Sequence, residues 1–390
     1  MEMTKYKLGD VLNFYNGRLR PNSKGPFPVF GGNGIIDYVA EYNYENNIII
    51  GRVGANCGSV QKYDGKCWVS DNAISVTVKE GFSKDCVYYL LKLLDLNKKH
   101  IGAAQPLLTQ EIVSNLVVYL PKYEDQKKIA SVLSALDDKI ALNKKMNQKL
   151  EAMAKRLYDY WFVQYDFPDK NGRPYKTTGG SMTYNPILKR EIPAGWEVSS
   201  FTDFGFFKNG INYDKNEIGD ETVKIVNVRN ISDSTTYFNI DELDDITLKS
   251  DDIQKFVATP KDILLARSGS PGATRLLPQT DKKIIYCGFI IRYQLNEQDL
   301  DKQLYLFHVL KGYEQVTSTQ SAGSILKNIS QDTLNALMVV MPQSSVLDAF
   351  NKKIAPIYSM LRKNISELNK LTILRDKLLP LLMNGQVVVG

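Results

Sequence analysis

The sequence predicts a mixed α/β protein made of two similar halves, each a globular domain followed by a long helix. Three observations support this prediction. The chain of 390 residues exceeds what one core usually organises, short β-rich runs alternate with Gly- and Asn-rich loops, and two long segments carry an apolar seven-residue repeat. The expected order is a first domain over 1–121, a long helix over 122–160, a connector over 161–194, a second domain over 195–342 and a second long helix over 343–384.

The two halves align with each other in the same order from front to back. The matches are Asn16-Gly17 with Asn209-Gly210 at an offset of 193, Arg52 with Arg267 at an offset of 215, and Ile101–Pro121 with Ser321–Pro342 at an offset of 221. A shared order makes an internal duplication a better explanation than chance similarity. The growing offset predicts insertions in surface loops of the second half.

The long helices are expected to pair as an antiparallel coiled coil. The apolar positions step by four and three residues, and the second helix repeats the seam of the first at an offset of 221. An asparagine stands at the same seam position in each helix, where a buried amide typically fixes register. An alternative is that each helix packs only on its own domain. The seam residues are Ile129, Leu133, Leu136, Ile140, Asn143, Leu150 and Leu157, then Phe350, Ile354, Ile357, Leu361, Asn364, Leu371 and Leu378.

Composition excludes several classes of protein. The four cysteines form no CxxC pair and the chain has only two histidines, so neither a metal site nor histidine-relay catalysis is expected. No apolar run approaches the roughly 20 residues of a membrane-spanning helix, and the start of the chain has no signal-peptide core. We therefore expect a cytoplasmic protein without a membrane partner. A net charge of +6 permits a nucleic-acid partner without requiring one.

One segment imitates a cofactor motif. Phe30–Gly34 matches the FxGxG pattern of adenosylmethionine-dependent methyltransferases, which needs a buried strand before it and a helix after it. Prolines precede the segment and Ile35-Ile36 follows it, which predicts a turn between strands instead. The catalytic NPPY-like tetrapeptide is also missing, because Asn185-Pro186 runs into Ile187-Leu188. The sequence predicts a chain that binds no cofactor and is not an enzyme.

Two duplicated Gly-rich segments are the best candidates for a binding site. Ile48–Val60 and Ile263–Leu276 each place an arginine directly after an apolar strand and before closely spaced glycines, where backbone N–H groups and a guanidinium can approach phosphates. The alternative is a tight turn whose arginine pairs with its own domain. Polar groups of these and nearby loops are expected to contact DNA: Asn33, Arg52, Asn56, Lys62 and Gln105 in the first half, and Arg267, Ser268, Ser270, Arg275 and Lys327 in the second.

The chain as a whole resembles the specificity subunit of Type I restriction–modification systems. The resemblance rests on the helix start LPKYEDQKKIASVLSALDDKI, on the connector WFVQYDFPDKNGRPYKTTGG with EIPAGWEV after it, and on the two-fold repetition of domain and helix. The second helix start departs from the pattern, since MPQSSVLDAF replaces the acidic-Gln sequence, so contacts there are expected to differ.

The resemblance implies a function that adds no chemistry of its own. Such subunits carry two target-recognition domains, each reading one half of a bipartite DNA sequence, while the paired helices set the spacing between the half-sites. They dock two methyltransferase subunits, which hold S-adenosylmethionine and methylate adenine N6, together with restriction/translocase subunits. Two other functions stay open at this point. One is a coiled-coil adaptor that does not bind DNA, and the other is a stand-alone DNA adenine methyltransferase, against which the missing motifs argue.

Overall fold

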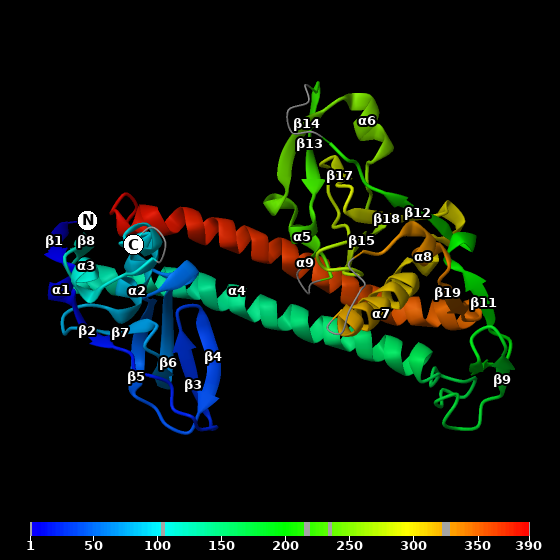
Figure 1. Ribbon diagram of the computed structural model, residues 1–390, viewed down its shortest axis with the longest axis horizontal. Helices are drawn as coiled ribbons and strands as arrows, with labels where there is room; N and C mark the ends of the chain where they lie inside the picture. Colours follow the sequence, from blue (N-terminus) through cyan, green and yellow to red (C-terminus); the bar gives the residue numbers. More distant parts are fainter. Residues whose placement is uncertain (1, 103–105, 214–218, 233–235, 322–327, 390) are drawn as a thin grey trace. The chain divides into compact units, whose positions relative to one another are not determined.

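The computed structural model describes residues 2–389 except 103–105, 214–218, 233–235 and 322–327 (Figure 1). The chain forms two compact units. The first unit contains Met1–Leu142 with Lys370–Gly390, and the second contains Asn143–Asn369. Each unit therefore holds one globular domain and parts of both long helices.

The first unit is built on a six-stranded sheet with the strand order β2-β7-β5-β6-β3-β4. Ile48, Ile50, Ile74 and Val76 of the central strands are buried in one core with the apolar side of α2 (Lys84–Leu93). The strands are β2 (Leu12–Asn16), β3 (Phe27–Gly31), β4 (Gly34–Val39), β5 (Tyr44–Gly51), β6 (Val60–Val69) and β7 (Ala73–Val78), and a separate pair is formed by β1 (Met3–Lys7) with β8 (Val117–Pro121).

The second unit repeats this arrangement in several sheets. The order β12-β18-β15-β16 corresponds to β2-β7-β5-β6, and the order β14-β13-β17 supplies the remaining strands. Its strands are β11 (Glu197–Ser200), β12 (Gly205–Asn209), β13 (Glu221–Val226), β14 (Asp244–Leu248), β15 (Ile263–Ala266), β16 (Thr274–Leu276), β17 (Ile284–Tyr286), β18 (Ile290–Leu295) and β19 (Met338–Met341), with the connector hairpin β9 (Met182–Asn185) and β10 (Arg190–Pro193).

The duplication extends to strand register. In the first half Lys7 pairs with Val117, and in the second half the equivalent Ser200 pairs with Met338. The central strands also share one register. Gly51 pairs with Ala73 in the first half, and the equivalent Ala266 pairs with Ile290 in the second. A one-residue slip would turn every side chain to the other face, so equal registers mean equal inward faces. The predicted internal repeat is confirmed.

Short helices begin at equivalent caps in the two halves. The Thr109 hydroxyl accepts from the N–H of Ile112 at the start of α3 (Gln110–Ser114), and Ser330 does the same for Thr333 at the start of α8 (Gln331–Asn335). A hydroxyl at this position satisfies one of the N–H groups that a helix start leaves free. The remaining helices of the domains are α1 (Leu8–Val11), α5 (Val228–Ser232), α6 (Ser250–Lys255) and α7 (Gln303–Ser321).

The insertions of the second half lie between strands, as the growing offset predicts. The strands β3 and β4 are joined by Gly32-Asn33 alone, whereas α5 and the turn Ile240–Glu242 stand between β13 and β14. Phe238 of this longer connection is buried in a core with β13 and β17. Two residues earlier, the N–H of Thr236 donates a hydrogen bond to the Glu151 carboxylate at 2.6 Å. The insertion is thus packed against the rest of the second unit.

The long helices are α4 (Tyr123–Tyr158) and α9 (Ser344–Met383), and they run antiparallel within each unit. In the first unit Asp137 pairs with Arg375 at 2.9 Å, and Ile129 shares a core with Leu382. In the second unit Asn143 Nδ2 donates to Glu367 Oε2 at 3.2 Å. Every predicted seam residue is buried or half-buried.

Some seam residues contribute both to helix pairing and to the core of a domain. Ile129 and Leu133 pack into the core of the first domain, and Phe350, Ile354 and Leu361 pack into the core of the second. Toward the outer parts of the seam, each long helix therefore packs on its own domain as well as on the other helix.

The departure at the second helix start also has a structural reason. In the first half Gln126 is buried, donates to the carbonyl of Pro121 at 2.8 Å and accepts from the N–H of Ser83 at 2.8 Å. Its equivalent in the second half is Leu347, which is 3% exposed and packs in the core. An amide that joins two backbone segments is replaced by apolar packing.

Candidate nucleic-acid interface

Several loops of the first domain meet at one end of its sheet. The hydroxyl of Ser59 bonds the carbonyl of Gly32, and the N–H of Gly54 donates to the carbonyl of Pro106 at 3.1 Å. The N–H of Arg52 donates to the carbonyl of Asn72 at 2.9 Å. We call this set, Gly32-Asn33, Arg52–Asn56, Asp71-Asn72 and Pro106–Leu108, the first loop cluster.

The second domain has an equivalent set of loops. The N–H of Arg267 donates to the carbonyl of Phe289 at 2.8 Å, as Arg52 does to Asn72. The carbonyl of Arg267 accepts from the N–H of Ile329 at 2.9 Å, as the carbonyl of Arg52 accepts from Leu108 at 2.9 Å. We call Ser232, Arg267–Ser270, Gly288-Phe289 and Ile329 the second loop cluster. Both clusters therefore hold an arginine between the same two backbone segments.

Glycine is required where these loops turn. Gly54 and Gly269, which follow the two arginines, have φ of +74° and +75°, a conformation that residues with a Cβ rarely adopt. Gly17 approaches the turn Ser70–Ala73 so closely that a Cβ would lie 1.7 Å from the carbonyl oxygen of Ser70. Gly210 also lies against the equivalent turn, where a Cβ would be 2.2 Å from the carbonyl oxygen of Cys287. The loop clusters are thus held by tight backbone contacts.

The two arginines are available for a ligand. Both are half-buried, and within the described part of the chain neither guanidinium has an ion pair or hydrogen bond. The alternative that each arginine pairs with its own domain does not describe these two side chains. Asn33, at the hairpin turn, and Asn56 are exposed beside Arg52. Ser268 and Ser270 are half-buried beside Arg267, and the Ser270 hydroxyl donates to Ser232 Oγ at 3.1 Å.

Lys62 lies outside the first loop cluster. It stands on β6 and pairs with Asp85 at 2.6 Å, with 25% of its side chain exposed. Burial lowers the pKa of this ammonium, but the hydrogen bond and charge of Asp85 outweigh it and raise the pKa overall. A lysine already neutralised by a carboxylate gains less from a phosphate, so its predicted role in DNA contact finds no support in its position.

Arg275 requires a correction. The residue is 1% exposed, its Nη1 donates to the carbonyl of Thr274 at 2.6 Å, and it pairs with Glu314 at 3.4 Å. A guanidinium without exposed surface has nothing to offer a phosphate or a base edge. The expectation that Arg275 contacts DNA is wrong for this structure, and the residue instead joins β16 to α7. Gln105 and Lys327 lie outside the described residues.

The motif-like segment Phe30–Gly34 is a hairpin. Strands β3 and β4 pair antiparallel across Gly32-Asn33, with Gly31 opposite Gly34. This confirms the predicted turn between strands and differs from the strand–helix turn of a cofactor site. The described residues contain no group of His, Cys, Asp or Glu side chains suited to hold a metal ion. None of the described helices is long and apolar enough to cross a bilayer.

Sequence reasoning missed three exposed side chains at the clusters. Arg18 stands beside the turn Ser70–Ala73, where its N–H donates to the carbonyl of Val69 at 3.0 Å. Asn72 and Phe289 occupy equivalent turn positions, and both are exposed. The alignment of the two halves could have found Asn72 and Phe289. An offset of 217 residues pairs Ala73 with Ile290, and these residues directly follow Asn72 and Phe289.

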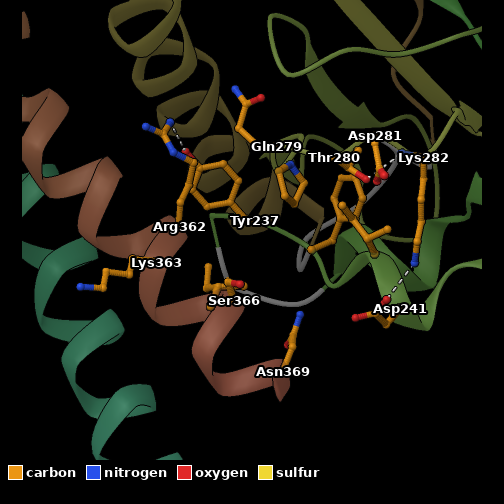
Figure 2. A pocket seen from close by; sticks show the side chains of 14 residues that line it. Tyr237, Asp241, Gln279, Thr280, Asp281, Lys282, Arg362, Lys363, Ser366 and Asn369 are labelled. Carbon is orange, nitrogen blue, oxygen red and sulfur yellow. Dashed lines mark hydrogen bonds and ion pairs between the residues drawn. The ribbon is translucent and has the colours of Figure 1, made fainter. Parts of the chain in front are cut away.

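A groove of the second unit lies between the insertion and α9 (Figure 2). Arg362 Nη1 donates to the Tyr237 hydroxyl at 3.4 Å on one side of the groove, and Lys282 pairs with Asp241 at 3.0 Å on the other side. Asn369 Nδ2 donates to Asn239 Oδ1 at 2.8 Å. The contacts of Tyr237 with Arg362 and of Asn239 with Asn369 therefore join the insertion to α9.

Comparison with known proteins agrees with this geometry. Residues 1–152 match the family described as Type I restriction modification DNA specificity domain. The Type I restriction enzyme MjaIX specificity subunit of Methanocaldococcus jannaschii is 26% identical over 324 residues, which are 81% of this chain and 72% of that protein. The EcoprrI specificity subunit of Escherichia coli is 33% identical over 137 residues, 35% of this chain and 34% of that protein.

A solved structure shows the same fold. The crystal structure of the Type I restriction–modification S subunit from M. genitalium superposes with a TM-score of 0.63 at 14% identity, covering 98% of this chain and 96% of that one. The comparisons thus agree with the resemblance found in the sequence, and residues 1–152 are the part that matches the family of Type I DNA specificity domains.

Proposed function

We propose that this chain is a specificity subunit of a Type I restriction–modification system, and that it reads a bipartite DNA sequence with one recognition domain for each half-site. The first recognition domain occupies 1–121 and the second 195–342. Asn33, Arg52 and Asn56 contact DNA in the first domain, and Arg267, Ser268 and Ser270 contact it in the second. Exposed amides, hydroxyls and guanidinium groups are the side chains that read base edges and hold phosphates.

One observation supports this proposal most directly. An arginine with no partner among the described residues is held between the same two backbone segments in both domains, by hydrogen bonds of 2.8–2.9 Å. A turn with a purely structural role would not need an arginine at this point of both domains. Two such sites in one chain fit a target with two half-sites.

The long helices and the repeated architecture suit docking to partner subunits. The duplication offers two similar surfaces, which matches two methyltransferase subunits, one for each half. The methyltransferase subunits hold S-adenosylmethionine and methylate adenine N6, and restriction/translocase subunits complete the complex. The antiparallel pair of α4 and α9 sets the distance between the half-sites. The chain itself recognises the target sequence and catalyses no reaction.

The experiment is base-resolved sequencing of adenine methylation in the source cell, with the gene intact, deleted and restored. We expect a bipartite methyladenine motif that disappears on deletion and returns with the wild-type gene. Restoration with Arg52→Ala or Arg267→Ala should change or weaken only one half of the motif, by about tenfold or more in methylation rate if the arginine contacts a base.

The adaptor hypothesis makes the opposite prediction. A coiled-coil adaptor that does not bind DNA would leave every methylation motif unchanged when the gene is deleted while the partner genes are expressed. A stand-alone methyltransferase would bind labelled S-adenosylmethionine as a purified single chain. Either result would contradict the proposed function.

A further inference from the structure

One exposed aromatic residue stands in a stretch that is otherwise buried. Between 284 and 293 every residue is buried except Phe289, which is 61% exposed. It lies in a four-residue turn, because the N–H of Ile290 donates to the carbonyl of Cys287 at 2.9 Å. Single exposed apolar residues are common, so exposure by itself decides nothing.

The turn that carries Phe289 contacts two neighbouring segments. A Cβ on Gly288 would lie 1.9 Å from Asn212 Oδ1, so the Asn212 side chain lies directly against the turn. The carbonyl of Phe289 accepts from the N–H of Arg267, and the turn is therefore part of the second loop cluster. The Phe289 ring and the Arg267 guanidinium, which has no partner among the described residues, therefore belong to two backbone segments joined by a hydrogen bond.

The first domain has the same turn with a different side chain. There the N–H of Ala73 donates to the carbonyl of Ser70 at 3.0 Å, and the carbonyl of the exposed Asn72 accepts from Arg52. The strands before the turns agree as well, since the N–H of Ser70 donates to Phe30 and that of Cys287 to Val226. Asn72 and Phe289 thus occupy equivalent positions in the two domains, with a polar amide in the first and an apolar ring in the second.

We propose that this position determines sequence specificity, and that Phe289 makes an apolar contact with bases of the half-site read by the second domain. The inference rests on the proposed function. An exposed phenyl ring, on a turn that is hydrogen-bonded to the backbone of Arg267, suits a base edge that carries a methyl group, or a flexible base step that admits an apolar wedge. Asn72 bonds a base edge of the other half-site, where an amide recognises adenine through two hydrogen bonds.

The test uses the full chain assembled with its methyltransferase subunits. The variants Phe289→Ala, Phe289→Asn and Asn72→Ala are compared with Phe206→Ala, which removes a 47% exposed phenylalanine of β12 outside the loop cluster. Methylation motifs are sequenced in cells, and binding of each complex to its target duplex is measured. Thermal unfolding of each variant shows that the fold is kept.

We expect Phe289→Ala to relax the motif in one half-site and to weaken binding of the target about tenfold, with the other half-site unchanged. Asn72→Ala should affect only the opposite half-site, and Phe206→Ala neither. A folded Phe289→Ala complex with wild-type motif and affinity would overturn this inference, as would an equal loss at both half-sites. Failure of the proposed function is distinct, because deletion of the gene would then remove no motif.

Discussion

The residue that ends the central strand differs between the two halves. In the first half it is Gly51, and in the second half the same position holds Ala266, which is 1% exposed. A Cβ on Gly51 would lie 2.5 Å from the carbonyl oxygen of Asn56 and 2.7 Å from that of Gly32. The short turn Gly32-Asn33 thus presses on the strand end, and the longer connection of the second half leaves room for a methyl group. The connections, more than the strands, distinguish the two domains.

Exchange of these two residues is the strongest way to test this comparison. We expect Gly51→Ala to destabilise the first domain by about 3 kcal/mol or more, because two backbone oxygens must move. Ala266→Gly should cost the second domain only about 1 kcal/mol, for a lost methyl group and added backbone freedom. Hydrogen exchange followed by mass spectrometry would report each domain separately. Equal effects of the two variants would mean that the first turn adapts to the added Cβ.

Much of the fold follows from the sequence, because it depends on local patterns. The helix seams and the Gly-rich turns each repeat at a constant offset, so the second copy supports the first. The longer connection between β13 and β14 has no counterpart in the first half. Without a repeat to guide it, the burial of Phe238 and the bond from Thr236 to Glu151 could not be predicted.

A second comparison concerns the bond that joins each domain helix to a long helix. In the first half the Tyr89 hydroxyl donates to Asp137 of α4 at 2.9 Å. At the equivalent place His308 of α7 lies 2.9 Å from the hydroxyl of Tyr358 on α9. Burial, together with the cations Lys311 and Lys155, lowers the pKa of His308 to about 3. Burial raises the pKa of Tyr89, so only the second bond contains a group that titrates near neutral pH when the chain unfolds.

This difference predicts a pH dependence for one half. The unfolded chain binds a proton on His308 below about pH 6.5, whereas the folded chain does not until about pH 3, so stability falls as the pH is lowered between these values. Lowering the pH from 7 to 5 should cost about 2 kcal/mol at this residue. His308→Gln should lose that part of the pH dependence and Tyr89→Phe should keep it, in denaturant unfolding followed in the second unit. Identical slopes for wild type and His308→Gln would contradict the assignment.

The candidate site was harder to predict than the fold. Duplication marks Arg52 and Arg267 as candidates, and Asn33 and Asn56 stand in Gly-rich loops, so the sequence alone could propose these residues. Arg275 was misjudged because sequence shows a basic residue near a loop but not that the strand β16 turns it inward. Burial depends on which strands pair, and that depends on contacts far apart in the chain.

The seam asparagines offer the finest comparison. They are equivalent in sequence, yet Asn143 Nδ2 donates to Glu367, while Asn364 Nδ2 has no hydrogen-bond partner among the described residues. Both side chains are buried, at 2% and 8% exposure. An unsatisfied buried amide costs stability, whereas a bonded one contributes modestly. The two residues should therefore respond differently to the same substitution.

We expect Asn364→Leu to stabilise the second unit by about 1 kcal/mol, because an apolar side chain replaces an unbonded amide in an apolar seam. Asn143→Leu removes the bond to Glu367 and should be neutral or destabilising by up to about 1 kcal/mol. Thermal unfolding of the two variants under one condition measures the difference. If both variants gain the same stability, the hydrogen bond to Glu367 contributes nothing to stability. The asparagines would then only fix the register of the two helices. In that case the double variant should be more stable than the wild type while its methyladenine motif loses a single spacer length, because helix register sets the distance between the half-sites.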